Sequence, residues 1–442
     1  MVDRLTPIYR PIIERFLLIK HLQPDIRLTV TPSCEYEIAR ISTDNPDEEV
    51  KEVLCRPYFR KMLSQWNSAD IIAGFHALES LRALSAEWLD AEFILPLHKI
   101  LFDDDTINRS ILKKRFYFSD DYGCWYANDK DRKPSLEAAY GALRTAQILL
   151  SFTGRKCSLE NLDDMLGAGR IQSFEKYLKS CADSTTGGFR DQGEEVATIA
   201  STGLAIRISA LLQKAYNKSN GMKLELFMNS KFAFDAQLTP SGFISNCCRQ
   251  REIDGRQAYG FSENPYDEEI WICVSYFAAA SLNLLGATKK FRSREYESGF
   301  TEFMNSCKRR AATSAQDSAA MGFSANPKFK AADLMHTFYA LKFAEILCPK
   351  VLQRENDAFF CGIAEFVDSC RVEGGYGFRP HWAPNLFSTC LARNTYDLIR
   401  NYRRKLAINY DPVESLTLIS NCFAGPEYGF SGYPLQISSR IR

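Results

Sequence analysis

The 442 residues exceed the size at which a single compact core stops growing, so the length predicts one large or two medium domains. Hydrophobic residues make up 45% and charged residues 25%, as in soluble globular proteins. The net charge of +1 gives no general electrostatic reason to expect binding to nucleic acid or to an anionic membrane.

The N-terminal part carries few structural signals. We expect residues 1–67 to form an extension and a first outer helix, and residues 68–442 to form the main domain. The run "IRLTVT" (26–31) is the most strand-like segment, and it fits either a short hairpin arm or an extended edge. Residues 1–23 lack the apolar run of a signal peptide, and no window has the roughly 18 apolar residues of a membrane span. With 14 scattered cysteines and no CxxC, this predicts reduced thiols and a cytoplasmic protein.

A repeated unit organises the rest of the chain. Each copy has a Gly-aromatic pair in a polar stretch, followed 12 to 17 residues later by a helix that begins with small or hydroxyl residues. The copies are residues 122–150, 187–212, 259–286, 321–347 and 374–399, with a truncated sixth at 428–437. The segment 68–84 resembles the helical half alone.

The two helices of each unit differ in pattern. The helix after the Gly turn is apolar nearly all round, as in 204–211, which predicts an inner position. The segments before the turn, such as 173–184 and 355–370, are amphipathic and suit an outer layer. Glycine permits the positive-φ backbone expected where one helix leads into the next. Six such hairpins predict an all-α protein, an α/α toroid in which inner and outer helices form a six-hairpin barrel, with all Gly turns at one mouth.

These Gly-aromatic units resemble the repeats of protein prenyltransferase β subunits and of the related terpene cyclases of the squalene–hopene type, which share an α–α toroid. The resemblance covers roughly residues 68–437. For the chain, it implies an isoprenoid substrate. In the prenyltransferase branch it also implies zinc as cofactor and a separate helical-repeat α subunit as partner.

The resemblance also implies a zinc site. "DLMHT" places Asp333 and His336 in the family's Asp-x-x-His-Thr stretch, and Cys273 in "ICVSYF" is in register with the family's cysteine. A thiolate, an imidazole and a carboxylate around one open position would bind and activate a substrate thiol. Without a metal, Asp333 would cap a helix and Cys273 would be a buried packing residue.

The sequence departs from the family at two places. Trp271 stands where the family has an Asp, so one of the acidic residues 267–269 would have to act as a shifted ligand. The turn "GFSENPYDEEIW" also lacks the bases with which the family holds a prenyl diphosphate. Neighbouring turns offer other cations: Arg190, Arg249, Arg251 and Arg256.

The cyclase branch needs an acid that protonates an alkene or epoxide. "GEE" (193–195) places Glu194 and Glu195 at the expected barrel mouth, where like charges can raise one pKa into the range of a general acid. The alternative is a carboxylate pair that is favoured by the dipole of the following helix.

Aromatic residues gather at the Gly turns. In both branches such residues line an apolar cavity for isoprenoid chains and stabilise carbocations, whereas in the alternative they pack one hairpin against the next. The candidates for contact with substrate are Trp125, Phe189, Phe261, Trp271, Phe323, Tyr376 and Trp382.

Three functions follow. The first is prenyl transfer from a prenyl diphosphate to a thiol, with Cys273 and His336 as zinc ligands. The second is a metal-independent terpene cyclase with an acidic residue at the barrel mouth. The third is a non-catalytic toroid that binds a hydrophobic ligand or a protein.

Overall fold

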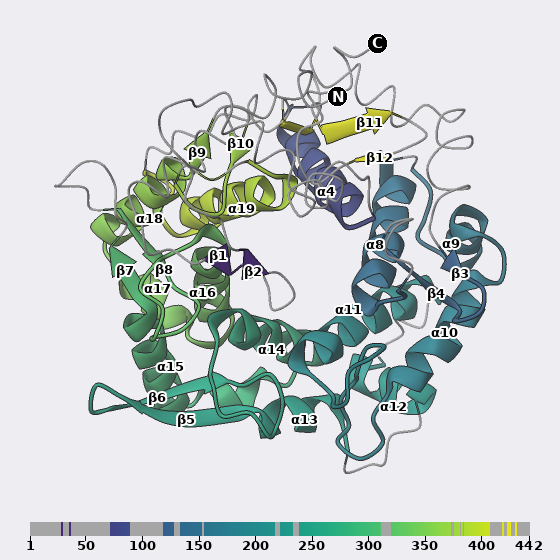
Figure 1. The fold of residues 1–442 in the computed structure, drawn as a ribbon, viewed down its shortest axis with the longest axis horizontal. Helices are drawn as coiled ribbons and strands as arrows, with labels where there is room; N and C mark the ends of the chain where they lie inside the picture. Colours follow the sequence, from purple (N-terminus) through teal and green to yellow (C-terminus); the bar gives the residue numbers. More distant parts are fainter. Residues whose placement is uncertain are drawn as a thin grey trace.

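Six helices follow one another around a closed ring (Figure 1). They are the inner helices, and each packs against the next until α19 returns to α4. Their bounds are α4 (Ile71–Trp88), α8 (Leu136–Phe152), α11 (Ile199–Ala215), α14 (Ile272–Leu285), α16 (Leu334–Leu347) and α19 (Leu386–Tyr402).

The structure is a computed structural model. It describes residues 28–29, 35–36, 71–88, 118–127, 133–152, 154–216, 222–232, 238–310, 320–372, 375–380, 382, 384–406, 418–419, 422–425 and 429–430. The predicted N-terminal extension and first outer helix at 1–67 lie outside these residues, apart from two paired strands of two residues each, β1 (Leu28–Thr29) and β2 (Glu35–Tyr36). That hairpin includes part of the strand-like run 26–31.

A second set of helices surrounds the ring on its outside (Figure 1). They include the two amphipathic segments for which the sequence predicts an outer position, which form α10 and α18. The outer helices are α9 (Leu159–Leu166), α10 (Arg170–Cys181), α12 (Leu224–Phe232), α13 (Pro240–Asn246), η1 (Thr288–Arg292), α15 (Arg294–Cys307), α17 (Pro349–Arg354) and α18 (Asp357–Ser369). The predicted all-α toroid is confirmed.

A small antiparallel hairpin stands at five of the six Gly turns, which the sequence did not predict. At the turn before α11, Phe189 forms only isolated bridges with Ala182 and Thr198. Most strands have only two or three residues, too few to show an alternating pattern. The hairpins pair β3 (Phe118–Ser119) with β4 (Cys124–Trp125), β5 (Cys248–Ile253) with β6 (Arg256–Phe261), β7 (Lys308–Arg310) with β8 (Met321–Phe323), β9 (Arg371–Val372) with β10 (Gly375–Tyr376), and β11 (Phe423–Gly425) with β12 (Gly429–Phe430).

The aromatic residue of each Gly turn is tied to the start of the next inner helix. The Phe323 N–H donates to Thr337 Oγ1 at 3.0 Å, and the Phe323 carbonyl accepts from the Asp333 N–H at 3.1 Å. Phe261 makes the same pair of bonds with Ser275 and Trp271, at 2.9 and 3.3 Å. This repeated pattern places residues 271 and 333 at equivalent positions, immediately before α14 and α16.

The glycine before each of these aromatics serves close packing more than backbone strain. A Cβ on Gly260 would lie 2.9 Å from Ile270 Cβ, and one on Gly322 would lie 2.8 Å from the Phe366 ring. Neither of these two glycines has positive φ, unlike Gly187 at φ 80°. The expectation that all the turn glycines supply positive φ is therefore wrong for these two positions, because the limit there is the space beside the backbone.

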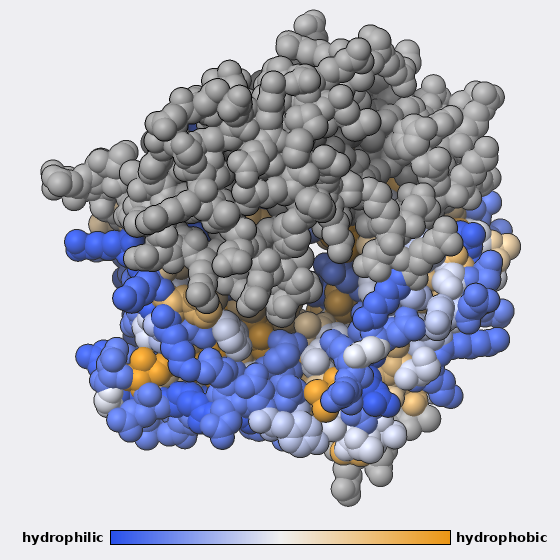
Figure 2. All heavy atoms as spheres, viewed as in Figure 1, coloured by the Kyte–Doolittle hydropathy of each residue, from blue (hydrophilic) through white to orange (hydrophobic). Residues whose placement is uncertain are grey.

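The described part of the surface is mostly hydrophilic on the face seen in Figure 2, with small, separate apolar areas. Within the described ranges, no helix is both long enough and apolar enough to cross a membrane. The cysteines in these ranges are all free thiols.

Candidate functional site at the starts of α14 and α16

Asp333 and His336 form a buried pair at the first turn of α16. Asp333 is the residue before the helix, and its Oδ1 accepts a hydrogen bond from the His336 backbone N–H at 2.9 Å. Its other oxygen, Oδ2, lies 2.7 Å from Nδ1 of the His336 ring. Both residues are only 8% exposed. The carboxylate therefore caps the helix and fixes the imidazole at once, which leaves Nε2 as the free ring nitrogen.

The first turn of α14 brings Cys273 to this pair. The half-buried Cys273 lies close enough to His336 to contribute to the raised pKa of that imidazole. On the other side, Arg379 Nη2 lies 3.9 Å from Asp333 Oδ2, and the Arg379 guanidinium stands 5.2 Å from the centre of the Trp382 ring. The structure thus brings together four residues named from the sequence: Cys273, Asp333, His336 and Trp382.

The electrostatics of the pair favour a protonated imidazole. Burial lowers the pKa of His336, but the hydrogen bond to Asp333 and the Asp333 charge, with a contribution from Cys273, outweigh burial and raise the pKa to about 9. A carboxylate that accepts from Nδ1 is the usual partner of a histidine that works through Nε2.

This pKa predicts a pH dependence of stability. A folded pKa of about 9 lies above the ordinary value of 6.5. The stabilisation is therefore fully present below pH 6.5 and is lost as the pH rises through 9, by about 3 kcal/mol in total. Urea unfolding between pH 6 and 10 measures it, and His336→Gln is expected to flatten the profile over this range. An equally steep loss in His336→Gln would contradict the assignment.

Trp271 occupies the position before α14 that Asp333 occupies before α16. In α8, α11, α16 and α19 the residue at this place is an acceptor: Ser135, Thr198, Asp333 and Asn385 each accept from a backbone N–H three residues on. Trp271 makes no such bond. Its ring, 5.8 Å from that of Phe329, packs beside the mouth instead. The α14 N-terminus therefore receives no side-chain cap from Trp271.

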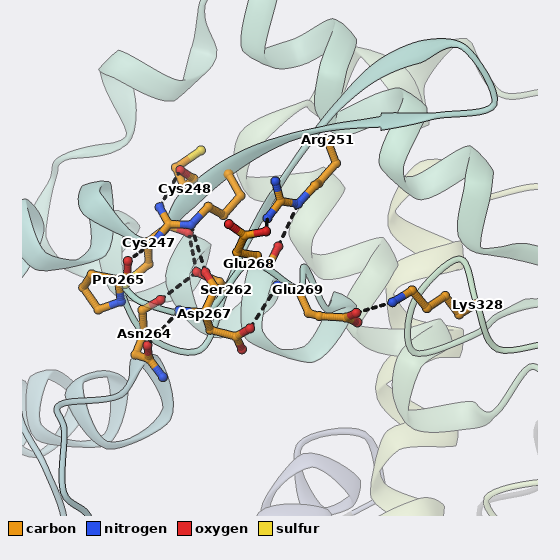
Figure 3. Close-up of polar contacts among 11 residues, drawn as sticks. Cys247, Cys248, Arg251, Ser262, Asn264, Pro265, Asp267, Glu268, Glu269 and Lys328 are labelled. Atoms are coloured by element: carbon orange, nitrogen blue, oxygen red, sulfur yellow. Dashed lines mark hydrogen bonds and ion pairs between the residues drawn. The ribbon is translucent and has the colours of Figure 1, made fainter.

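The acidic residues of the preceding turn have other partners (Figure 3). Asp267 Oδ1 accepts from the Glu269 N–H, Glu268 pairs with Arg251 at 3.0 Å, and Glu269 pairs with Lys328 from the next turn. The three carboxylates that the sequence offered as a shifted zinc ligand are thus engaged with other groups. In the described ranges, no group of three His, Cys, Asp or Glu side chains could hold a metal ion.

Arg249 is a structural clamp. Its guanidinium donates to the carbonyls of Asp267, Asn246, Cys248 and Pro265. Arg309 repeats the arrangement one unit later, donating to the carbonyls of Phe329, Ser306, Lys308 and Pro327. The recurrence of Arg two residues after Cys247 and Cys307 was the signal in the sequence that could have revealed it. Arg256 pairs with Glu302 on α15 at 3.1 Å.

The carboxylates considered for acid catalysis lie at the start of α11. Glu194 accepts from the Asp191 N–H at 2.6 Å and from Ser201 Oγ at 2.8 Å, so it fastens the turn to the helix. Glu195 is exposed, and Arg190 is an exposed residue that donates to its backbone carbonyl at 3.5 Å. In the described structure, these three residues form no contact with Cys273, Asp333 or His336.

Sequence reasoning missed Glu263, which lies beside them. Burial, with a contribution from the charge of Glu194, raises the pKa of Glu263, although its carboxylate accepts from the Ala200 N–H at 3.1 Å. It is a half-buried carboxyl at the N-terminus of α11.

Most of the aromatics considered for substrate contact lie in the wall of the ring. Trp125, Phe189, Phe261, Phe323 and Tyr376 are fully buried at 0% exposure. Trp125 packs against Phe174 of outer helix α10, and Phe261 packs against Phe300 of outer helix α15, with ring centres 5.1 and 6.0 Å apart. In the structure, these five residues pack between helices, which was the alternative to substrate contact in the sequence analysis.

A second aromatic set, which the turn pattern did not single out, lies on the inner helices. Tyr276 of α14 stacks on Tyr339 of α16 with ring centres 4.6 Å apart, and Phe277 lies 5.5 Å from Tyr339. Arg207 of α11 stands 5.8 and 5.4 Å from the centres of the Tyr276 and Phe277 rings. Arg207, the one charged residue in the mostly apolar run 204–212, was the signal in the sequence that could have revealed this set.

The donor set for zinc is incomplete in the described residues. Cys273 and His336 Nε2 are two donors, Asp333 holds the opposite side of the imidazole, and Trp271 has no metal-binding atom. Catalytic zinc sites use three protein ligands and one open position. The described residues therefore do not fit a catalytic zinc ion, and the zinc expected from the resemblance stays a prediction.

The comparison with protein-family models agrees with the ring. A search of curated proteins found no match. Among solved structures, Candida albicans protein geranylgeranyltransferase-I complexed with GGPP matches at 15% sequence identity and a TM-score of 0.43, covering 77% of this chain and 94% of that one. The model of the prenyltransferase alpha-alpha toroid domain matches residues 132–263 and 263–434, more than half of the chain. The chain belongs to the prenyltransferase alpha-alpha toroid domain family.

Proposed function

We propose that this chain binds an apolar, isoprenoid-type ligand on the inner faces of α11, α14 and α16. The observation that supports this most is the aromatic group of Tyr276, Phe277, Phe338 and Tyr339 with Arg207 beside it, which we call the inner aromatic group. Its residues come from three consecutive helices of the ring.

The orientation of α14 follows from its hydrogen bonds. Ser275 faces outward, because its Oγ accepts from the Phe261 N–H in the outer hairpin. Tyr276 and Phe277 lie on the other side of the helix and are only partly buried, while Ala278, Ala279 and Leu282 are buried. On α16, Thr337 faces outward in the same way. Partly exposed apolar side chains on an inner face suit an apolar ligand.

The polar end of the ligand is expected to be neutral. The turn before α14 carries Asp267, Glu268 and Glu269, and Lys328, the base that faces it, is already paired with Glu269. A diphosphate needs several unpaired cations close together. Arg249 and Arg251 of this turn are held by carbonyls and by Glu268.

Titration of the purified chain with farnesol and with farnesyl diphosphate tests this proposal. Farnesol is expected to bind more tightly, and Tyr276→Ala is expected to weaken farnesol binding about 10-fold, because aromatic contact contributes about 1 kcal/mol beyond its buried area. The matched control is Tyr266→Ala, since Tyr266 is 74% exposed at the mouth. Tighter binding of the diphosphate, or equal effects of the two variants, would contradict the proposal.

Zinc-assisted prenyl transfer to a thiol is the second candidate. The proximity of Cys273 to His336 favours it, because the family resemblance implies these two residues as ligands. It would need a third ligand, and the resemblance implies a helical-repeat α subunit as partner. Elemental analysis of the chain, purified alone and with co-purifying partners, tests it: about one zinc per chain that is lost in His336→Ala would support transfer.

A further inference from the structure

We propose that Arg207 binds a single carboxylate at the inner end of an apolar-chain ligand, inside the ring. The apolar chain rests on the proposed function above. The neutral end argued there lies at the mouth, beside the acidic turn before α14. The carboxylate is a second polar group, at the opposite end of the same chain.

The side chain of Arg207 faces the interior of the ring. Thr202, five residues earlier, faces outward, because its Oγ1 accepts from the Phe189 N–H in the outer turn at 2.9 Å. Five residues rotate a helix by about 140° beyond one full turn, so Arg207 lies on the far side of α11. Its guanidinium there stands 5.8 and 5.4 Å from the centres of the Tyr276 and Phe277 rings of α14, the next inner helix (Figure 1).

Arg207 also lies deeper in the ring than the acidic turn. It is the ninth residue of α11, so its Cα stands about 12 Å along the helix from the helix start. The turn with the three acidic residues 267–269 precedes the start of α14 and belongs to the mouth. An anionic group is therefore repelled at the mouth and attracted at Arg207, which gives the ligand one orientation.

Three inner helices carry a base at the same position, and Arg207 differs from the other two. The ninth residues of α8, α11 and α16 are Arg144, Arg207 and Lys342. Arg144 Nε donates to Glu79 Oε1 at 2.6 Å, and Lys342 donates to Glu345. Among the described residues, no hydrogen bond or ion pair engages the Arg207 guanidinium, which has only aromatic rings beside it. Its donors are thus left for a ligand.

The surroundings of Arg207 match one carboxylate. A guanidinium can donate to both carboxylate oxygens at once. The hydroxyls of Tyr276 and Tyr339, whose rings stack 4.6 Å apart, can donate as well, since no hydrogen bond engages them in the described structure. Burial raises the pKa of Tyr339, so this hydroxyl keeps its proton. A diphosphate carries more negative charge than one cation balances.

Titration calorimetry of the purified full chain with ω-hydroxydodecanoic acid and with dodecane-α,ω-diol tests the inference. The two probes share a hydroxyl at one end and differ only in the group at the other end. The acid is expected to bind native protein about 10-fold more tightly than the diol, because a hydrogen bond between charged groups is stronger than one between neutral groups.

Substitutions at Arg207 assign the preference to its charge. Arg207→Met removes the charge but keeps an unbranched, helix-favouring side chain, so the variant is expected to fold and to bind acid and diol equally. Arg207→Lys keeps the charge and is expected to retain part of the preference. Arg256→Met is the matched control, because Arg256 is exposed and pairs with Glu302 on α15, and it is expected to keep the full preference. Urea unfolding midpoints check folding, and Arg207→Gln replaces Arg207→Met if methionine prevents it.

Equal binding of acid and diol to native protein would overturn the inference, and so would a preference for the acid that survives in a folded, uncharged variant of Arg207. In both cases, farnesol binding that depends on Tyr276 would leave the proposed function in place. If farnesol and the diol do not bind, the proposed function fails. Binding of the acid alone would then still support the site at Arg207, whereas binding of none of the three would overturn both.

Discussion

Replacing Trp271 with aspartate is expected to create a zinc site that the native residues do not complete. The carboxylate would stand immediately before α14, two residues from Cys273 and across from His336. A thiolate, an imidazole and a carboxylate are sufficient protein ligands for a catalytic zinc ion, so Trp271→Asp is expected to hold about one zinc per chain. Elemental analysis after dialysis measures the bound zinc. The rate at which iodoacetamide alkylates Cys273 is an independent measurement, and it is expected to fall when zinc is bound.

Trp271→Asn is the matched control for this substitution. Both Asp and Asn can cap α14, so both variants are expected to gain about 1 kcal/mol of stability over the native chain. Only the aspartate supplies an anionic ligand, so only Trp271→Asp is expected to bind zinc, and adding His336→Ala is expected to remove it. Equal zinc in Trp271→Asp and Trp271→Asn would show that residue 271 does not face the metal position.

Replacing Phe261 with alanine is expected to destabilise the ring strongly. Phe261 is fully buried, and its ring lies 5.4 Å from that of Phe291 and 6.0 Å from that of Phe300. Removing a buried aromatic ring leaves a cavity and costs about 3–5 kcal/mol. The midpoint of urea unfolding measures the change.

Two controls separate packing from ligand contact at Phe261. Tyr266→Ala removes an exposed aromatic five residues later in the same turn and is expected to change the midpoint little. Phe261→Leu keeps most of the volume, so it is expected to fold and to bind farnesol like the native chain. Weaker farnesol binding in a fully folded Phe261→Leu variant would instead place Phe261 in contact with the ligand.

Much of the fold could be predicted from the order of residues. The inner helices are apolar nearly all round because they pack against outer helices on one face and against neighbouring inner helices on two others. This packing requires a continuous apolar run, which is visible in 204–211 and in its counterparts. Gly turns recur because the backbone beside Phe261 and Phe323 has no room for a Cβ, although the expected cause, positive φ, was wrong at Gly260 and Gly322. Most of the hairpins at the Gly turns were missed because their strands are too short to show an alternating pattern.

The candidate site could be predicted only in part. The register of the repeats placed Cys273 and His336 at the starts of adjacent inner helices, and in the structure Cys273 contributes to the raised pKa of His336. The roles of charged residues could not be read in the same way, because they depend on partners distant in sequence. Arg249 and Arg251 carry the same charge and stand two residues apart, yet one clamps backbone carbonyls and the other pairs with Glu268.

The sequence by itself determined the family, the ring of six hairpins and the identity of the residue before each inner helix, because these depend on local pattern and spacing. Only the tertiary structure decided what those residues do. In the structure, Asp333 contacts Nδ1 of the His336 imidazole, and Trp271 provides no cap for α14. Most of the turn aromatics are buried in the wall of the ring, whereas Tyr276 and Tyr339 stack on the inner faces. The physical reason is that a side chain's role is set by the atoms that surround it, and in this ring those atoms come from the next repeat.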